Sequence, residues 1–209
     1  IISQLDINSR QSLTQIGRKI NLSPQVVQYR LNNLIKENII RCIAFTDLSK
    51  IGYSTYLVNF RLKNVDEKKL DEIVEYIKKN NFVRALIALD GLYDLRTAIL
   101  SKSIFEFNSI LKDICNKFEK NISEKVTGIV LNRNYPLRNY LIDDKKNRLE
   151  SLDFNDIPPA IAKFDKIDLR ILRELCKNSR ISSVEIASEL KISADSVIRR
   201  VKNLEKEGI

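Results

Sequence analysis

Residues 9–39 read SRQSLTQIGRKINLSPQVVQYRLNNLIKENI, and residues 179–209 read SRISSVEIASELKISADSVIRRVKNLEKEGI. We call these stretches the first copy and the second copy. Aligned without a gap, they share twelve positions, namely Ser9/Ser179, Arg10/Arg180, Ser12/Ser182, Ile16/Ile186, Ser23/Ser193, Val27/Val197, Arg30/Arg200, Asn33/Asn203, Leu34/Leu204, Lys36/Lys206, Glu37/Glu207 and Ile39/Ile209. The repeat predicts that one structural unit occurs twice in the chain.

Each copy carries two helix starts at the same offset. Ser12 and Ser182 are each followed three residues later by Gln or Glu, the pattern of a capping box. Ser23 begins a second helix with Pro24 at its first position, where the missing N–H costs nothing, and Ser193 begins the equivalent helix. With only a short turn between the two helices, each copy is predicted to be a helix-turn-helix.

The second helix of each copy has an apolar stripe and a polar outer face. In the first copy Val27, Leu31 and Leu34 recur at helical spacing and are predicted to face the core. Amides, hydroxyls and arginines on the opposite face suit base edges and phosphates in a major groove. The candidate DNA-contacting residues are Ser23, Pro24, Gln25, Gln28, Tyr29, Arg30 and Asn33, with Ser193, Asp195, Ser196, Arg199, Arg200 and Lys202 in the second copy.

The position of a residue along these helices predicts whether it contacts base edges or phosphate. Residues near the helix N-terminus enter the groove in this motif. The residues assigned to base edges are therefore Gln25, Gln28 and Tyr29 in the first copy and Asp195, Ser196 and Arg199 in the second. Arg30 and Arg200 lie later in the helix and are assigned to phosphate. A polar helix face that is merely solvated is the alternative, but two such faces in one basic chain favour DNA as the partner.

Composition narrows the classes of function further. The 209 residues carry a net charge of +9 with a pI of about 9.4, which favours a polyanionic partner. Cys42, Cys115 and Cys176 stand far apart, and the sequence has no histidine. These counts disfavour a zinc site and a Ser-His-Asp or Cys-His catalytic pair, so we expect no metal, no cofactor and no enzyme activity. The absence of a signal peptide and of a long apolar run predicts a cytoplasmic protein without membrane contact.

The middle of the chain changes to a different pattern. Alternating apolar residues from Tyr56 predict a strand, and Asp90-Gly91 marks a turn. The expected elements are strands near 56–62, 82–89, 92–100 and 125–133, and helices near 65–79 and 104–120. This βαββαβ order predicts a ferredoxin-like α+β domain with one sheet face under two helices.

The other sheet face is predicted to be apolar. Its expected members are Leu57, Leu86, Ala88, Ala98, Leu100, Ile129 and Leu131. An exposed apolar face usually marks an interface, so we expect a homodimer or a higher homo-oligomer.

Four segments follow from these patterns. We predict a winged helix-turn-helix at 1–52 with a β ribbon at 39–45 as its wing, a sensing and dimerising domain at 53–136, a linker at 137–163 and a second helix-turn-helix at 164–209. A weak helical period from Tyr140 to Leu152 suggests a short helix in the linker. We expect the chain to be truncated at both ends, because the second copy stops where the first continues into its wing.

Taken together, these segments resemble the Lrp/AsnC family of transcription regulators. FDKIDLRILREL (residues 164–175) and the second copy are similar to the family's winged-helix signature, and the first copy resembles it more loosely. Asp90-Gly91-Leu92-Tyr93-Asp94 is similar to the family's sensing hairpin. The resemblance implies a dimer that binds an amino acid or related effector near Gly91, Tyr93 and Asp94. The second unit after the sensor, and Asn38 in place of a glycine that Gly208 keeps, depart from the family pattern.

Two other classes of function stay open. Siroheme decarboxylase subunits resemble the same layout, but those enzymes rely on histidine near the tetrapyrrole and this chain has none. A sensor or assembly module that binds no DNA is the other alternative, since Val26 and Tyr29 put apolar groups on the outer face of the first copy.

Overall fold

The computed structural model describes residues 1–136, 138, 151–155 and 161–209. The chain forms two compact units. The helical unit comprises Ile1–Asp47, Ala162–Ile209 and the described residues of Asn134–Asp153. The sheet unit comprises Leu48–Arg133 and the described residues of Phe154–Ile161. Among the described residues, no helix is both long and apolar enough to cross a membrane.

The first copy folds as its caps predict. Its helices are α1 (Ile2–Ile7), α2 (Leu13–Ile20) and α3 (Pro24–Lys36). The Ser12 hydroxyl accepts the N–H of Gln15, whose side chain accepts the N–H of Ser12, so the capping box is complete. Leu5, Ile16, Val27 and Leu31 form a small buried core that holds the three helices together.

The second copy repeats this arrangement. It follows α6 (Lys166–Lys177) with α7 (Ser183–Leu190) and α8 (Ala194–Glu207). Ser182 and Glu185 complete the equivalent capping box. Asn21 and Lys191, which end α2 and α7, both adopt the left-handed conformation, with φ of 54° and 56°. Equivalent residues thus make the same turn in both copies.

The predicted wing of the first copy is not a β ribbon. Residues 40–47 form no strand. The segment of residues 39–45 instead runs from the first copy to the second. Ile40 packs against the first core, whereas Ala44 packs against the core of the second copy and donates its N–H to the carbonyl of Leu175 (3.1 Å). Apolar residues do alternate along this segment, but its backbone bonds to the C-terminal end of α6 and forms no β ribbon.

The linker holds a strand that the sequence did not indicate. β5 (Asn132–Pro136) and β6 (Ser151–Asn155) form a two-stranded sheet. Of the helix expected from Tyr140 to Leu152, residues 140–150 lie outside the described residues.

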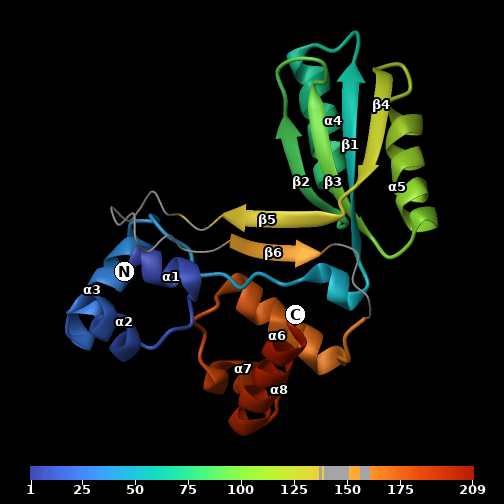
Figure 1. The fold of residues 1–209 in the computed structure, drawn as a ribbon. Coiled ribbons are helices and arrows are strands. Elements are labelled where there is room, and N and C mark those ends of the chain that lie inside the picture. Colours follow the sequence, from blue (N-terminus) through green and yellow to red (C-terminus); the bar gives the residue numbers. More distant parts are fainter. Residues whose placement is uncertain (137, 139–150, 156–160) are drawn as a thin grey trace. The chain divides into compact units, whose positions relative to one another are not determined.

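The sheet unit has the predicted ferredoxin-like order. Its elements are a 3-10 turn (η1, Leu48–Ile51), β1 (Ser54–Leu62), α4 (Glu67–Lys78), β2 (Val83–Ala88), β3 (Leu95–Ser101), α5 (Ile104–Lys117) and β4 (Ile122–Ile129). The strands lie in the order β2-β3-β1-β4, all antiparallel. Figure 1 shows α4 and α5 packed beside this sheet.

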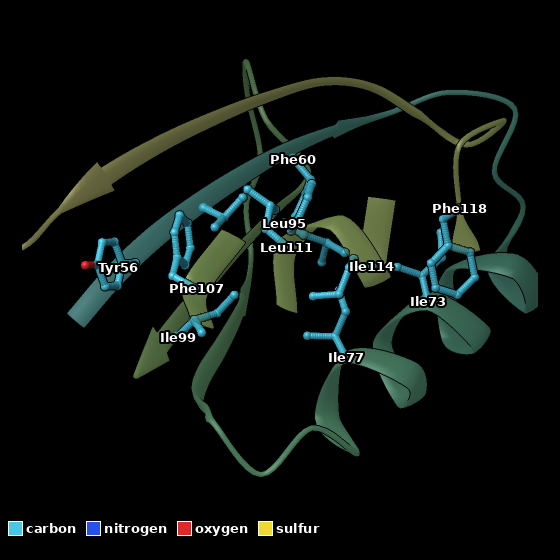
Figure 2. Close-up of a cluster of buried hydrophobic side chains, with 11 residues drawn as sticks. Tyr56, Phe60, Ile73, Ile77, Leu95, Ile99, Phe107, Leu111, Ile114 and Phe118 are labelled. Atoms are coloured by element: carbon cyan, nitrogen blue, oxygen red, sulfur yellow. The ribbon is translucent and has the colours of Figure 1, made fainter. Parts of the chain in front are cut away.

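One sheet face and the two helices enclose the core of this unit (Figure 2). Alternate residues of β1 and β3 point into it, and the rings of Tyr56 and Phe107 stack with centroids 4.2 Å apart. Val58, Phe60 and Ile99 are almost completely buried. The period-two pattern from Tyr56 therefore marks the inner face correctly.

The residues on the outer sheet face are not all those that the sequence predicted. Leu86 pairs with Thr97 and packs against the core, so it lies on the inner face. Ile129 pairs with the core residue Tyr56, Ala88 pairs with the core residue Leu95, and Leu131 lies beyond the end of β4. The outer face instead carries Leu57, Ala85, Ile87, Ala98, Leu100 and Val126, with Asn59, Arg61, Arg96 and Glu124 among them.

Candidate nucleic-acid interface

The outer face of α3 is exposed and held by its own cap. Ser23 accepts the N–H of Val26 at 3.3 Å, and Pro24 occupies the first turn. Val27 and Leu31 are buried on the inner side of the helix. The candidate residues Gln25, Gln28, Tyr29, Arg30 and Asn33 are all exposed.

Near its N-terminus this face combines amides with one large ring. Gln28 donates from Nε2 to Oδ1 of Asn32 at 2.7 Å, which presents both amides side by side. Tyr29 is 68% exposed, far more than a core aromatic. An open hollow on the same side is lined by Leu13, Pro24, Gln25, Gln28, Tyr29 and Asn32. Paired amides beside an apolar surface match the groups that read adenine and the thymine methyl.

The face of α8 has a different chemistry. Ser193 caps the helix by accepting the N–H of Ser196 at 3.2 Å. Asp195, Arg199 and Lys202 are exposed. Charged groups here replace the amides of Gln25 and Asn32 and the ring of Tyr29, and Gln28 aligns with the exposed Ile198. The first copy has five basic residues against one acidic, and the second has six against five.

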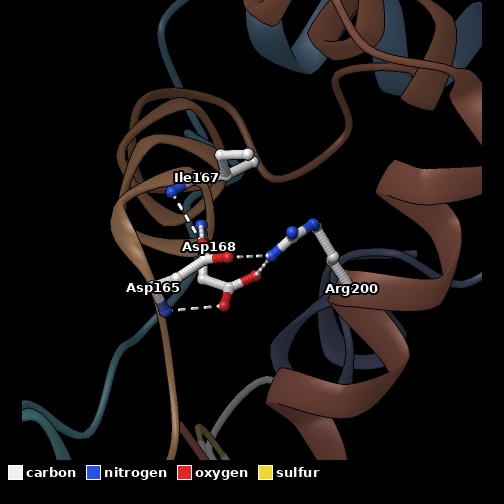
Figure 3. A network of polar contacts seen from close by, with 4 residues as sticks. All are labelled: Asp165, Ile167, Asp168 and Arg200. Atoms are coloured by element: carbon white, nitrogen blue, oxygen red, sulfur yellow. Dashed lines mark hydrogen bonds and ion pairs between the residues drawn. The ribbon is translucent and has the colours of Figure 1, made fainter.

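Arg200 does not have the environment that a phosphate contact requires. Its Nη1 donates to Asp165 Oδ2 and to Asp168 Oδ1, both at 2.8 Å, at the start of α6 (Figure 3). Its side chain is only 23% exposed. The two carboxylates raise the pKa of Arg200, with Asp168 the larger cause. In this structure the guanidinium ties α8 to the N-terminus of α6, so its assignment to phosphate is not supported.

The same network stabilises the cap of α6. Asp165 accepts the N–H groups of Ile167 and Asp168 at 2.8 and 2.9 Å, and Asp168 accepts the N–H of Asp165 at 2.9 Å. The backbone N–H of Asp168, followed by the Arg200 side chain, lowers the pKa of Asp165. The sequence signal that points to this role is a pair of aspartates at the helix start.

The candidate effector residues lie on the hairpin between β2 and β3. Gly91 has φ of +137°, a conformation that disfavours other residues. Asp94 accepts the N–H of Leu62 through Oδ2 at 2.6 Å, and its own N–H donates to the carbonyl of Phe60. The carboxylate therefore anchors the hairpin to β1. Asp94 is also exposed.

A neighbouring arginine extends this hairpin site. Arg61 donates from Nε to the carbonyl of Leu92 at 2.9 Å, lies over the ring of Tyr93 at 5.9 Å and pairs with Glu124 at 3.2 Å. Sequence reasoning did not single out Arg61, because only the strand pairing brings it to the hairpin. Across the part of the chain that the structure describes, no group of three His, Cys, Asp or Glu side chains is placed to bind a metal.

Comparison with known proteins agrees with this geometry. The model of a winged helix-turn-helix DNA-binding family matches residues 1–41 and 164–209. The regulator LrpC of Bacillus subtilis is 49% identical over 47 residues, which is 22% of this chain and 33% of that protein. The structure of an AsnC family transcriptional regulator from Agrobacterium tumefaciens has a TM-score of 0.55, with 19% identity over 61% of this chain and 83% of its own.

These comparisons support an Lrp/AsnC-type regulator.

Another relative aligns with this chain over most of its own length. An uncharacterised HTH-type transcriptional regulator of Pyrococcus furiosus is 24% identical over 137 residues, spanning 65% of this chain and 88% of that protein. A transcriptional regulator of Neisseria meningitidis, solved as a complex with L-Met, has a TM-score of 0.53 with 18% identity over 62% of this chain and 84% of its own.

One solved enzyme is similar in fold over most of this chain. The siroheme decarboxylase NirDL, solved with an iron-uroporphyrin III analogue, has a TM-score of 0.65 and covers 96% of this chain and 58% of its own. Its identity of 14% shows a shared fold alone. The sequence relatives described above are named as transcription regulators.

Proposed function

We propose that this Lrp/AsnC-type regulator binds duplex DNA sequence-specifically, with the N-terminal part of α3 in the major groove. The observation that carries the proposal is the outer face of α3, where Gln25, Gln28 and Tyr29 are exposed on a capped helix with a buried inner stripe. The same family model matches the second copy. There Arg199 and Lys202 are the exposed cations of α8 that we assign to DNA.

Fluorescence anisotropy with a labelled duplex of the gene's own upstream region tests this function. Phosphate contacts make log K fall linearly with log salt, by a slope of about 0.9 per phosphate neutralised. We expect a steep salt slope, and a loss of about 1–3 kcal/mol on the preferred site for Gln28→Ala. Lys112→Ala, an exposed lysine on α5, is the matched control. Weak binding without salt dependence would instead support an assembly module that binds no DNA.

The regulator dimerises through the outer sheet face of the sheet unit. Ile87 and Val126 are 49% and 43% exposed there, beside Leu57 and Leu100. An apolar face of this kind is expected to be covered in an assembly. Ile87→Glu together with Val126→Glu should convert dimers to monomers in sedimentation velocity. Phe105→Glu, at an apolar residue of α5 that is 84% exposed, controls for the added charge.

A small molecule with an ammonium group binds at the hairpin of Gly91, Tyr93 and Asp94. The regulator of Neisseria meningitidis solved with L-Met supports an amino acid as the class of effector. Asp94→Asn keeps an acceptor for Leu62 N–H but removes the charge. Calorimetry with L-Met and a panel of amino acids should show binding to the wild type and at least a tenfold loss in Asp94→Asn. Equal affinities would show that Asp94 serves only the hairpin.

The decarboxylase alternative is not adopted. The chain has no histidine, and the likeness to the enzyme shows the fold alone. Titration with an iron tetrapyrrole tests the choice directly. A saturable change in the visible absorption band at stoichiometric protein would favour the enzyme, whereas an unchanged band favours the regulator.

A further inference from the structure

Equivalent residues of the two copies bind each other. The Ser9 and Ser179 hydroxyls lie 2.7 Å apart. Arg10 donates from Nη1 to the carbonyl of Ser179 at 2.5 Å, and Arg180 donates from Nη1 to the carbonyl of Ser9 at 2.6 Å. A contact in which residue i meets j and j meets i is the signature of a twofold interface, normally formed by two subunits. Here a single chain supplies both halves.

Further contacts tie the same region together. Arg180 also donates to the carbonyl of Gln11 at 3.0 Å. The N–H of Ser179 donates to the carbonyl of Cys42 at 2.9 Å, in the segment that leaves the first copy. Ser179 is 1% exposed, so the bonds to its own N–H and carbonyl are shielded from water. Shielded hydrogen bonds that include charged donors hold their partners more firmly than exposed ones.

This interface leaves both recognition helices uncovered. The contacting residues precede α2 and α7 or follow α3, and none of them lies on α3 or α8. Gln25 and Gln28 on one copy, and Asp195 and Arg199 on the other, stay exposed. The helical unit therefore presents two recognition faces joined through equivalent residues.

The two faces differ where they would read bases. Gln25 aligns with Asp195, and Tyr29 aligns with Arg199. Glutamine suits adenine, a carboxylate accepts from the cytosine amino group, and arginine pairs with guanine. Subunits with one helix-turn-helix each pair as identical readers, which matches a palindromic operator. A chain with two unlike readers has no such symmetry in its recognition groups.

We propose that one chain reads a composite operator made of two different half-sites, one under α3 and one under α8, at a spacing set by the contact of Ser9 and Arg10 with Ser179 and Arg180. This inference rests on the proposed DNA binding and adds the class of sequence that is bound. The half-site under α8 is the one with G·C pairs, because Arg199 and Asp195 lie there.

Selection of tight binders from a random duplex library by the full chain tests the composite site. We expect a motif with two unlike halves at one fixed spacing. Repeating the selection with Gln28→Ala should relax one half, and Arg199→Ala the other. A motif whose two half-sites are identical, or relaxation of the same half by both variants, would overturn the proposal. Failure of the wild type to retain any duplex would refute DNA binding itself, which is a distinct outcome.

The contact between copies has its own test. In Arg10→Ala with Arg180→Ala, affinity for the selected composite duplex should fall at least tenfold, because linkage of two binding modules raises avidity by about 10²–10⁴. Affinity for each isolated half-site duplex should stay within twofold of the wild type. Arg84→Ala, an exposed arginine of the sheet unit, controls for the lost charge. An equal loss on composite and half-site duplexes would show that these arginines bind phosphate and do not set the spacing.

Discussion

Replacing Arg200 and its aligned partner Arg30 by Ala separates a structural arginine from a DNA-binding one. Arg200 is 23% exposed and bonded to Asp165 and Asp168, whereas Arg30 is exposed. The two residues occupy the same position in the repeat, so each variant is the other's control. Arg200→Ala should destabilise the helical unit, and Arg30→Ala should weaken DNA binding.

The magnitude follows from the burial of the pair with Asp168, whose side chain is 13% exposed. An exposed ion pair contributes about 0–1 kcal/mol, and a hydrogen bond to a charged group contributes about 1.5–3. The Nε of Arg200 is buried without a partner among the described residues, which lowers the net value. We therefore expect a loss of about 1–2 kcal/mol for Arg200→Ala and under about 0.5 kcal/mol for the surface change Arg30→Ala.

Urea unfolding followed by circular dichroism measures the first effect, and anisotropy titrations at several salt concentrations measure the second. With an m value of about 2 kcal/mol/M, the midpoint should fall by about 0.5–1 M for Arg200→Ala. Arg30→Ala should lower the salt slope by about 1, and Arg200→Ala should leave it unchanged. The reasoning would be wrong if Arg200→Ala kept the wild-type midpoint and lowered the salt slope as Arg30→Ala does.

Three further outcomes are expected. A Cβ at Gly17 would lie 2.4 Å from the carbonyl oxygen of Leu22. Gly17→Ala should therefore destabilise the protein by about 1–3 kcal/mol through overpacking, offset by about 1 kcal/mol of improved helix propensity. An unchanged melting temperature would show that the turn moves to accommodate the methyl group at little cost. Because the pKa of Asp165 is lowered, its stabilisation is complete above its unfolded value of about 3.9 and is lost as pH falls through the lower folded value. Below about pH 4, stability should then fall less steeply with pH in Asp165→Asn than in the wild type. Urea unfolding midpoints measured at several pH values in that range test this difference. Ser12→Ala and Ser182→Ala each remove the hydroxyl acceptor of a capping box and should cost about 1 kcal/mol apiece in urea unfolding, with Ser3→Ala as a control outside the caps.

Local patterns were enough to predict the helices of both copies and the order of the sheet unit. Serine caps and apolar spacing depend only on residues within one turn, and those of α2 and α7 are as predicted. The inner face of β1 also follows from alternation alone, since Tyr56, Val58 and Phe60 are buried. Such features need no information about distant partners.

Features that depend on distant partners were missed. The register of β2 shifts between Val83 and Ala85, so alternation read through that point places Leu86 on the wrong face. Residues 39–45 have a strand-like pattern, but Ala44 finds its partner at Leu175, far along the chain. Arg200 reads as a surface cation until Asp165 and Asp168 are placed beside it.

The identities between the copies now divide into groups with different physical causes. Ser12 and Ser182 cap helices, and Ile16 and Ile186 fill cores, so each serves its own copy. Arg10 and Arg180 serve the other copy instead, and the same guanidinium is needed on both sides because the contact is reciprocal. The N-terminal parts of the outer faces of α3 and α8 have no such constraint, and there Gln25 and Tyr29 align with Asp195 and Arg199. Reciprocal contacts with unlike recognition faces are what a single chain needs to hold two different readers in one arrangement.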